Sequence, residues 1–366
     1  MQCSKNRAAI PGCSILVDWL GYMANLLLPP TFWLVLAAHV AAQTITQSEA
    51  PVLFQREDEG TVYAINPDGS DLRRLIDGIR PVTSPDGRFA LVWRRRDIVR
   101  VSLGDGASVV VSEGGDYSWS PDGNYIAVQD GDGIYLVDRE GTGRKLLYQD
   151  GAWHPVWSPA DLSVIFFNRT WPNAFGPTDL FSVNVVTGEV RLVRARTFIP
   201  QIPYPGSPDG TRLLVSESGS ENVRVMNLET GELVSIGPSG ERVGAQRPAW
   251  SPDGKYIAFE VGDGMEGLYV ADSEGQTITR LIPGRSEAAP GGAAWSPDGG
   301  EIAFHLRSWS TSTPSRIYII NADGTGMRRL AEGSWPKWAP MGSSSYETPS
   351  APAPLTWGAL KYQFGP

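Results

Sequence analysis

Histidine and cysteine are scarce in this sequence, and their scarcity excludes several kinds of site. The 366 residues contain two cysteines and three histidines. Cys3 and Cys13 both precede the globular part predicted below, which therefore has no disulfide and no cysteine-based zinc site. His39 lies in an apolar N-terminal segment, which leaves His154 and His305. Because two histidines without an HExxH-type spacing make a poor ligand set, we expect no metal and no other cofactor.

Enzyme motifs and basic charge are missing as well. The chain has no GxSxG nucleophile elbow, no phosphate-binding P-loop and no dinucleotide fingerprint. Its formal net charge is −9, and only 19% of its residues are charged. Such an acidic protein lacks the basic surface that nucleic-acid binding requires, so no nucleic-acid partner is expected. These absences favour binding over catalysis, and no residue is predicted to be catalytic.

The first 42 residues are predicted to be an export signal. Lys5 and Arg7 come first, and the stretch from Trp19 to Ser48 contains no Asp, Glu, Lys or Arg. Its apolar centre, TFWLVLAAHVAA, ends on small residues that a signal peptidase recognises, which predicts cleavage after Ala42. The same stretch is long enough to be a retained membrane anchor instead. Either way, the rest of the chain is expected outside the cytoplasm: periplasmic, secreted or membrane-anchored.

The remainder is rich in Gly (41), Pro (29) and Trp (13), a composition that favours short strands and tight turns. One phrase recurs in it: WSPDGNYIAV at Trp119, WSPDGKYIAF at Trp250 and WSPDGGEIAF at Trp295, with weaker copies at Thr83, Trp157 and Gly206 and a truncated copy at Trp338. A second phrase alternates with the first. It reads IYLVDREGTGRKLL from Ile134 and IYIINADGTGMRRL from Ile317, and it also occurs seven times.

Each pair of phrases predicts four short strands, A to D. The IAF and IYLV runs are β-branched and aromatic, as in strands, and Ser-Pro-Asp-Gly has the composition of a tight turn. The tryptophans that end the A strands are expected to be structural and to fill the space between repeats: Trp119, Trp157, Trp250 and Trp295. The turn residues are expected to be structural too: Asp122, Gly123, Asp253, Gly254, Asp298 and Gly299.

These repeats predict an all-β protein, a seven-bladed β-propeller of four-stranded blades over residues 51–340. The 290 residues of this range give about 41 per repeat, within the usual length of a propeller blade. The range starts on a B-type strand, Val52 to Gln55, and ends on an A-type strand, Ser334 to Trp338. We therefore expect a C-terminal innermost strand to join three N-terminal strands and close the ring. Six or eight blades are the alternatives.

WSPDGKYIAF followed by IYIINADGTGMRRL resembles the TolB-type, WD-like propeller repeat, over nearly the whole exported part. The TolB family carries six blades behind an α/β domain, whereas this sequence predicts seven blades and no such domain. Oligogalacturonate lyases have similar propellers that hold a metal mainly through histidines, and this chain has too few histidines for that. Prolyl-oligopeptidase-type enzymes have similar repeats beside a hydrolase domain, for which there is no room after Pro340.

The B–C and D–A connections are expected to share one end of the propeller and to be long, as in Asn168–Thr178, Ile236–Arg247, Pro283–Gly292 and Leu306–Pro314. Long loops on a rigid scaffold commonly carry binding sites. The candidate ligand-binding residues at this end are Trp153, His154, Trp171, Arg247, Trp309, Trp335 and Lys337. Aromatic and scattered polar groups suit a protein, peptide or glycan ligand, although loop-to-loop packing would also explain them.

Two other functions remain open from the sequence. A polysaccharide lyase or hydrolase would need carboxylates that converge at the channel mouth, for which Asp116, Asp179 and Glu266 are candidates. A sensor domain would keep the N-terminal segment as its anchor, which is also the only membrane contact expected. Residues 43–50 are predicted to be a linker. Residues 341–366 are predicted to be a Ser/Pro-rich tail with an added strand or docking segment. A monomer is expected.

The signal-peptide hypothesis predicts the mature N-terminus. Expression in a host with a secretory pathway should give a protein that begins at Gln43, because signal peptidase cleaves after small residues such as Ala42. Intact-mass measurement of the exported protein checks this. A mass that includes the whole leader would support the anchor instead.

Overall fold

The computed structural model describes residues 50–56, 58–170, 178–200, 205–217, 223–237, 245–261, 267–283, 288–308 and 314–340. The predicted leader, the linker up to residue 49 and the predicted tail of residues 341–366 lie outside these residues. Within them every regular element is a β-strand, and no helix is long and apolar enough to cross a bilayer. The all-β prediction is thus confirmed for the described part of the chain.

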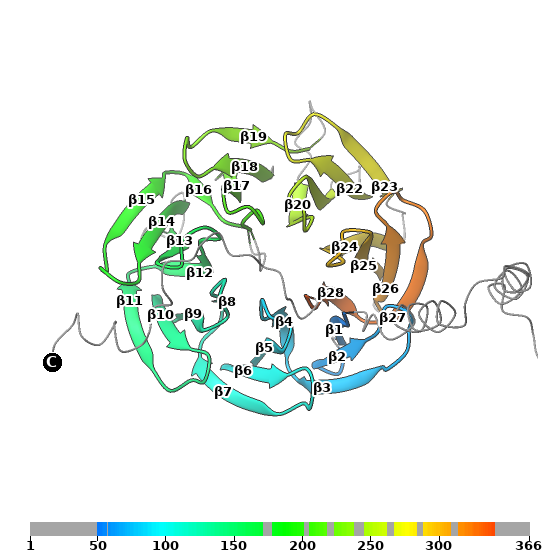
Figure 1. Cartoon of the computed structure of the whole chain (residues 1–366), viewed down its shortest axis with the longest axis horizontal. Coiled ribbons are helices and arrows are strands. Elements are labelled where there is room, and N and C mark those ends of the chain that lie inside the picture. The colour runs from blue at the N-terminus through cyan, green and yellow to red at the C-terminus, as the bar shows by residue number, and fades with distance from the viewer. Residues whose placement is uncertain are drawn as a thin grey trace, which may run out of the picture. The chain divides into compact units, whose positions relative to one another are not determined.

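The strands form seven antiparallel sheets of four, which are the blades of a propeller (Figure 1). From its innermost to its outermost strand, blade 1 consists of β28 (Ser334–Trp338), β1 (Val52–Arg56), β2 (Thr61–Ile65) and β3 (Arg73–Asp77), and blade 2 consists of β4 (Ile79–Thr83), β5 (Phe89–Arg94), β6 (Asp97–Ser102) and β7 (Ser108–Glu113). In the same order, blade 3 consists of β8 (Tyr117–Trp119), β9 (Tyr125–Asp130), β10 (Gly133–Asp138) and β11 (Arg144–Gln149). Blade 4 consists of β12 (Ala152–Trp157), β13 (Val164–Thr170), β14 (Thr178–Asn184) and β15 (Val190–Arg194). Blade 5 consists of β16 (Thr197–Phe198), β17 (Arg212–Glu217), β18 (Val223–Asn227) and β19 (Leu233–Ser235). Blade 6 consists of β20 (Ala245–Trp250), β21 (Tyr256–Val261), β22 (Gly267–Asp272) and β23 (Ile278–Pro283). Blade 7 consists of β24 (Ala288–Trp295), β25 (Glu301–Ser308), β26 (Arg316–Asn321) and β27 (Arg328–Glu332).

The ring closes as the repeat count predicts. β28 pairs antiparallel with β1, with Val52 opposite Trp338 and Leu53 opposite Lys337. The Ala339 N–H donates to the carbonyl of Pro51 at 2.9 Å, which extends this pairing beyond the strands. The seven blades and the 1+3 closure are both confirmed. The two ends of the repeat region therefore complete one sheet.

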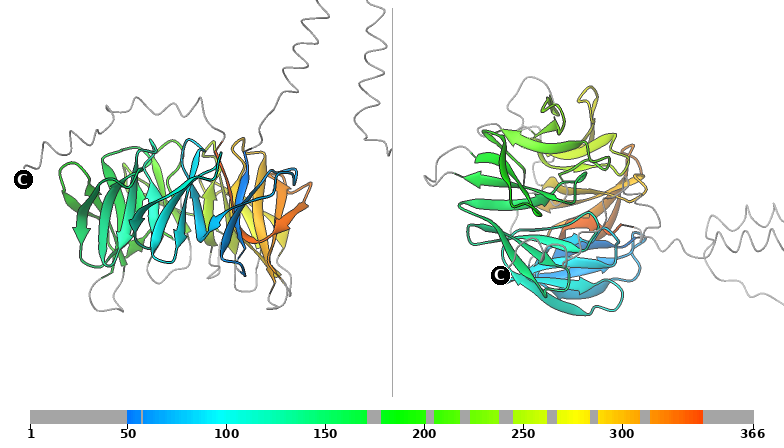
Figure 2. Two further views of the ribbon diagram at one scale, coloured as in Figure 1. Left: turned by 90° about the horizontal axis from the view of Figure 1, so that it is seen from below. Right: turned by 60° about the vertical axis from the view of Figure 1, so that its left-hand side comes forward.

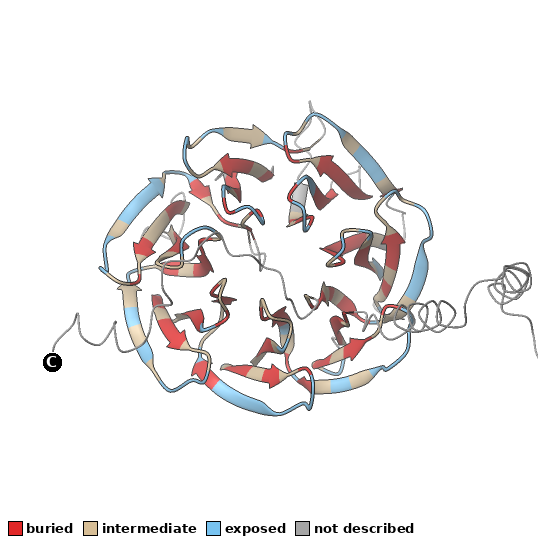
Figure 3. Ribbon diagram, in the orientation of Figure 1, coloured by how far each residue is buried: buried red, intermediate tan, exposed pale blue. Residues whose placement is uncertain are grey.

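Hydrophobic cores fill the spaces between successive blades, and each of the seven clusters draws on two neighbouring blades. The inner strands are largely buried and the outermost strands are exposed (Figure 3). Five of the seven clusters contain the tryptophan that ends an A strand, and the other two lie where Thr83 or Gly206 replaces it. The indole is thus the usual filler between blades, as the sequence predicted.

Several of these tryptophans also bond to the blade before them. The Nε1–H groups donate to carbonyls of the preceding blade: Trp119 to Val82 at 3.2 Å, Trp250 to Pro205 at 3.1 Å and Trp295 to Ala249 at 3.0 Å. A buried N–H that finds a partner avoids the desolvation penalty of an unpaired polar group. The repeat tryptophan therefore joins blades by both packing and a directional bond.

The Ser-Pro-Asp-Gly turns interlock at one end of the propeller. In the turn after Trp119, the Asp122 carboxylate accepts from the Ser120 hydroxyl at 2.6 Å and from the Asn124 N–H at 3.1 Å. Gly123 has a φ of 68°, which favours glycine. A Cβ added there would lie 3.6 Å from Pro85 of the preceding blade. The turns thus pack proline against glycine from blade to blade.

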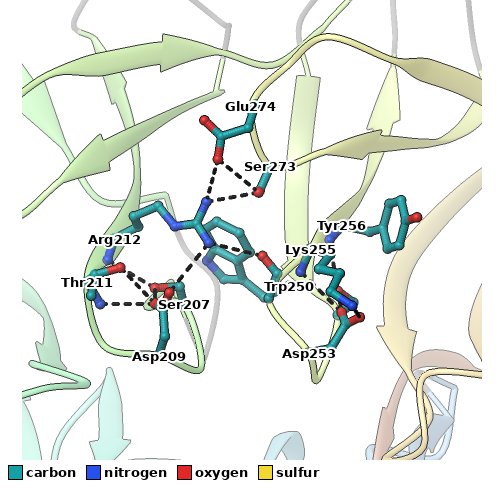
Figure 4. A network of polar contacts seen from close by, with 12 residues as sticks. Ser207, Asp209, Thr211, Arg212, Trp250, Asp253, Lys255, Tyr256, Ser273 and Glu274 are labelled. Atoms are coloured by element: carbon teal, nitrogen blue, oxygen red, sulfur yellow. Dashed lines mark hydrogen bonds and ion pairs between the residues drawn. The ribbon is translucent and has the colours of Figure 1, made fainter.

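Charged side chains join some blades near the outside. Arg212 of β17 in blade 5 donates to the Ser273 hydroxyl at 2.9 Å, to Glu274 at 3.0 Å and to the Gly254 carbonyl at 3.1 Å, all in blade 6 (Figure 4). Its guanidinium also lies 5.1 Å from the Trp250 ring centroid. A multidentate guanidinium of this kind fixes orientation better than a single lysine contact. It helps to set the angle between the two blades.

The connections differ from the prediction of uniformly long loops. The strands run along the propeller axis (Figure 2), so the B–C and D–A connections do share one end. Several D–A connections are nonetheless short, since Gly78 alone joins β3 to β4 and Gly333 alone joins β27 to β28. Their φ values of 143° and 145° explain the glycines. Parts of the expected loops are strand, because β13, β20, β24 and β25 extend into them.

Truncation of a repeat tryptophan tests the packing account. Trp295→Ala should lower the free energy of unfolding by about 3–5 kcal/mol, because it opens a cavity between blades 6 and 7. Trp295→Phe, which loses mainly the bond to Ala249, should cost about 1 kcal/mol. Urea unfolding followed by circular dichroism measures both. Leu192→Ala is the control, because Leu192 is 54% exposed on β15 and its loss should matter little. Equal losses at the two positions would contradict the account.

Candidate functional site

A backbone bulge near the start of several inner strands places unusual side chains around the axis. Four residues there have positive φ although they are not glycine: Arg80 (57°), His154 (54°), Arg247 (47°) and Trp335 (57°). Each precedes a proline, and the strand register shifts at each one. In blade 7 Gly292 takes this position, with a φ of 63°. Bulges commonly re-aim a side chain beside a functional site, and left-handed backbone is costly for residues other than glycine.

A polar side chain from the preceding blade satisfies the backbone of several bulges. The N–H of Arg80 donates to Gln55 Oε1 at 2.9 Å, and the N–H of Gly292 donates to Glu260 Oε1 at 2.5 Å. The N–H of Trp335 lies 3.4 Å from His305 Nδ1, which accepts from it. Gln55, Glu260 and His305 hold the same position in their blades, directly after the IAF-type triplet. Each of these three bulges is therefore held by its neighbour.

Three of the candidate residues come together where the ring closes. Arg247 Nη1 donates to Glu260 Oε2 at 2.9 Å, and the guanidinium lies 4.7 Å from the centroid of the Trp335 ring. The His305 ring lies 5.1 Å from Trp335 at an interplanar angle of 51°. Lys337 follows Trp335 by two residues on β28. We call these five residues, from blades 6, 7 and 1, the closure cluster.

Two glycines of blade 7 make this close approach feasible. A Cβ added at Gly291 would lie 2.9 Å from His305 Cε1 and 3.3 Å from Glu260 Oε2. A Cβ at Gly292 would lie 3.0 Å from His305 Nδ1 and 3.2 Å from Trp335 Cε3. Blade 7 thus contributes no side chain at its own bulge. The gap that it leaves lets Arg247 of blade 6 reach Trp335 of blade 1.

Burial shifts the pKa values of three groups in the closure cluster. Burial raises the pKa of Glu260, although the Arg247 ion pair and the Gly292 N–H oppose this. Burial and the charges of Arg247, Arg307 and Lys337 lower the pKa of His305 to about 3, so His305 is neutral at pH 7. Burial lowers the pKa of Lys337 to about 8, with Glu260 acting in the opposite direction.

A second polar group joins blades 2, 3 and 4. Arg80 Nη1 lies 3.1 Å from Asp116 Oδ1, and His154 Nδ1 lies 3.7 Å from Asp116 Oδ2. Burial raises the pKa of Asp116, but His154 and Arg80 more than offset this and leave it lowered. The 3.7 Å separation is too long for a hydrogen bond. Both nitrogens of the buried His154 ring lack a hydrogen-bond partner among the described residues.

Several other candidate residues have structural partners or lie outside the described residues. Trp153 Nε1 donates to the Thr170 hydroxyl at 2.9 Å, so this indole has a structural partner. Asp179 accepts from the Arg196 N–H at 2.6 Å and is buried, which gives it a structural role. Trp171, Trp309 and Glu266 lie outside the described residues. His154, Arg247, Trp335 and Lys337 lie within the inner strands β12, β20 and β28.

Glu260 and His305 are the residues that sequence reasoning did not assign to the site. His305 lies inside β25 and is buried. Both directly follow the IAF triplet of the repeat, in YIAFE and EIAFH. An ionisable residue at a buried strand position requires a partner, and that requirement was the available signal.

No group of three or more His, Cys, Asp or Glu side chains that could hold a metal ion occurs among the described residues. At the opposite end of blades 6 and 7 lies a hollow of about 640 Å³, which Tyr256, Trp295 and Asp298 help to line. The Asp298 carboxylate is already used in its turn, by the Ser296 hydroxyl and the Gly300 N–H. The site with unusual backbone and electrostatics is therefore the end that carries the bulges.

No protein-family model and no curated protein sequence matches the chain. Solved structures match it by shape. TolB from Acinetobacter baumannii is 16% identical, with a TM-score of 0.52 over 80% of this chain and 66% of TolB. This is a TolB-like propeller fold. An oligogalacturonate lyase in complex with manganese is 17% identical, with a TM-score of 0.56 over 71% of this chain and 82% of the lyase.

A puromycin-hydrolyzing peptidase of Mycobacterium tuberculosis is also similar, at 18% identity and a TM-score of 0.51. The match covers 74% of this chain and 51% of the peptidase, so the TolB-like fold spans only about half of that enzyme. At these identities the three similarities establish the fold alone. The resemblance of the repeats to TolB is thereby confirmed at the level of fold.

The lowered pKa of Lys337 predicts how stability depends on pH. Between pH 8 and its ordinary pKa of 10.5, the unfolded state holds a proton on Lys337 that the folded state has lost. The contribution of Lys337 to stability should therefore rise with pH in this window, by up to about 1.4 kcal/mol per pH unit. Below pH 8 the charge is retained in the fold at a cost. Lys337→Met should thus be more stable than the wild type at pH 7.

Urea unfolding of both proteins from pH 7 to 10 checks this. The advantage of Lys337→Met should shrink above pH 8. Lys255→Met is the matched control, because Lys255 is 74% exposed in a turn at the opposite end. A constant difference between Lys337→Met and the wild type across this range would contradict the assignment.

Proposed function

We propose that this protein is an exported binding propeller that holds a protein, peptide or glycan at the end bearing the inner-strand bulges, without converting it. The observation that carries the proposal is the closure cluster. There Arg247 and Trp335 contact each other, and both have positive φ. Glu260 pairs with the Arg247 side chain, and His305 accepts from the Trp335 N–H. Strain and buried charge both lower stability, so a function at this end is their simplest explanation.

The surface chemistry supports binding. Arg and Trp are the residues most enriched at energetically important contacts. The Arg247 side chain is 38% exposed and Trp335 is half-buried, so a ligand can reach both. Both stand on strands rather than on long loops. Such preorganisation lowers the entropic cost of binding.

Catalysis has less support in the residues described. The polar groups nearest one another are ion pairs: Arg247 with Glu260, and Arg80 with Asp116. Neither arrangement provides two free carboxylates or an activated nucleophile. The manganese in the similar lyase structure belongs to that protein. The export part of the proposal rests on the N-terminal sequence.

Peptide and glycan arrays probed with the purified propeller test this function. We expect a retained ligand whose affinity falls by at least about 30-fold in the Arg247→Ala/Trp335→Ala double variant, because such anchors commonly contribute 2 kcal/mol or more. Tyr256→Ala, at a side chain 45% exposed at the opposite end, is the control and should bind normally.

Mass spectrometry of the retained ligand provides the second readout. An unchanged ligand mass, with and without added manganese, is expected for a binding protein. Cleaved sugars formed only with manganese would replace this proposal by the lyase alternative. Ligands that bind the double variant as tightly as the wild type would show that the site lies elsewhere.

A further inference from the structure

We propose that the closure cluster binds the carboxylate of an acidic peptide segment, with Arg247 and Lys337 as its two cationic contacts. This inference rests on the proposed function and names the ligand chemistry of the same site. It starts from a local excess of positive charge. Arg247 and Lys337 both act on His305, and Glu260, the carboxylate that also acts on Lys337, is paired with Arg247. The whole chain has a net charge of −9, so this excess is local.

Lys337 carries the first part of the argument. It lies half-buried on β28, and no hydrogen bond or ion pair to its ammonium occurs among the described residues. A cation in such a place normally has a counter-ion, because removal of charge from water is costly. Glu260 is near enough to influence Lys337, but it already accepts from Arg247 and from the Gly292 N–H. A ligand anion would complete the set.

Arg247 carries the second part. Its Nη1 donates to Glu260, and its guanidinium carbon lies 4.7 Å from the centroid of the Trp335 ring. A guanidinium has five N–H donors in a planar fork, so one bond to Glu260 leaves donors for a ligand. The side chain is 38% exposed, which allows access from solvent. A flat carboxylate fits such a fork.

The surroundings of Trp335 favour a peptide over a sugar. Sugars commonly rest on an open aromatic face, but Arg247 lies over this indole and His305 packs against it at 5.1 Å. These two contacts compete with a sugar for the faces of the ring. The recognition offered here is instead charge and hydrogen bonding, which an Asp or Glu side chain or a C-terminal carboxylate satisfies. Neutral His305 holds Trp335 by its backbone and is a positioning residue.

Calorimetric titration of the full chain tests this. The probes are a blocked peptide with two adjacent glutamates, the same peptide with glutamines, inorganic phosphate and an oligogalacturonate. We expect the glutamate peptide to bind at least about 10-fold more tightly than the glutamine peptide. Arg247→Gln and Lys337→Met should each weaken the glutamate peptide about 10-fold or more. Lys255→Met, the same charge change in a turn, should not.

The pH dependence separates a direct contact from a structural effect. Affinity of the wild type for the glutamate peptide should fall as pH rises from 7.5 to 9.5, because Lys337 loses its proton there. Lys337→Arg keeps its charge and should remove this fall. The other titratable and charged groups that act on this site are Glu260, whose pKa burial raises, His305, whose pKa is lowered to about 3, and the guanidinium groups of Arg247 and Arg307. Lys337→Arg therefore assigns the fall to Lys337 and not to these groups. Circular dichroism confirms that each variant folds.

The outcomes are distinct. Equal binding of the glutamate and glutamine peptides overturns the carboxylate inference, while array ligands that depend on Trp335 would still support the proposed function. Tighter binding of phosphate or of the oligogalacturonate than of the glutamate peptide overturns the peptide assignment. If no ligand depends on Arg247 or Trp335, both proposals fail.

Discussion

The inner-strand bulge, and the side chain that the preceding blade supplies to hold it, is the constraint on which the site depends. A bulge leaves a backbone N–H without its ladder partner. In blades 2, 7 and 1 that N–H finds Gln55, Glu260 or His305 of the blade before. Each bulged residue is thereby fixed relative to its neighbour. The clamp explains how Arg80 and Trp335 persist at positive φ around the axis.

The same contacts that hold the bulges also hold the closure cluster together. Glu260 has two tasks, because one oxygen holds the backbone of Gly292 and the other pairs with Arg247. Arg247 in turn lies against Trp335, whose backbone His305 holds. Several contacts therefore hold the side chains of the cluster in place. Its cost is the burial of the Lys337 charge, whereas the tryptophans and the interlocking turns stabilise the propeller elsewhere.

Most of the architecture could be predicted from the sequence, because it is built from local patterns. Ser-Pro-Asp-Gly specifies its turn through its own side chains, and IAF or IYLV specifies a buried strand. The number of repeats then limited the blades, and the unequal ends at Val52 and Trp338 predicted the closure. The loop lengths were predicted less well. Gly78 and Gly333 each make a whole connection, because one residue at a φ near 145° suffices to turn from one blade to the next.

The site was only partly accessible to sequence. Arg247, Trp335 and Lys337 could be singled out because they depart from the repeat, but nothing in the sequence brings Arg247 near Trp335, which is 88 positions later. By itself the sequence determined the strands, the turns, the seven repeats and the way the ring closes, since each depends on neighbouring residues or on a count. The tertiary structure alone decided that Glu260 and His305 belong beside them. Closing the ring places blades 6, 7 and 1 together, and the absent side chains of Gly291 and Gly292 let charges on different blades meet.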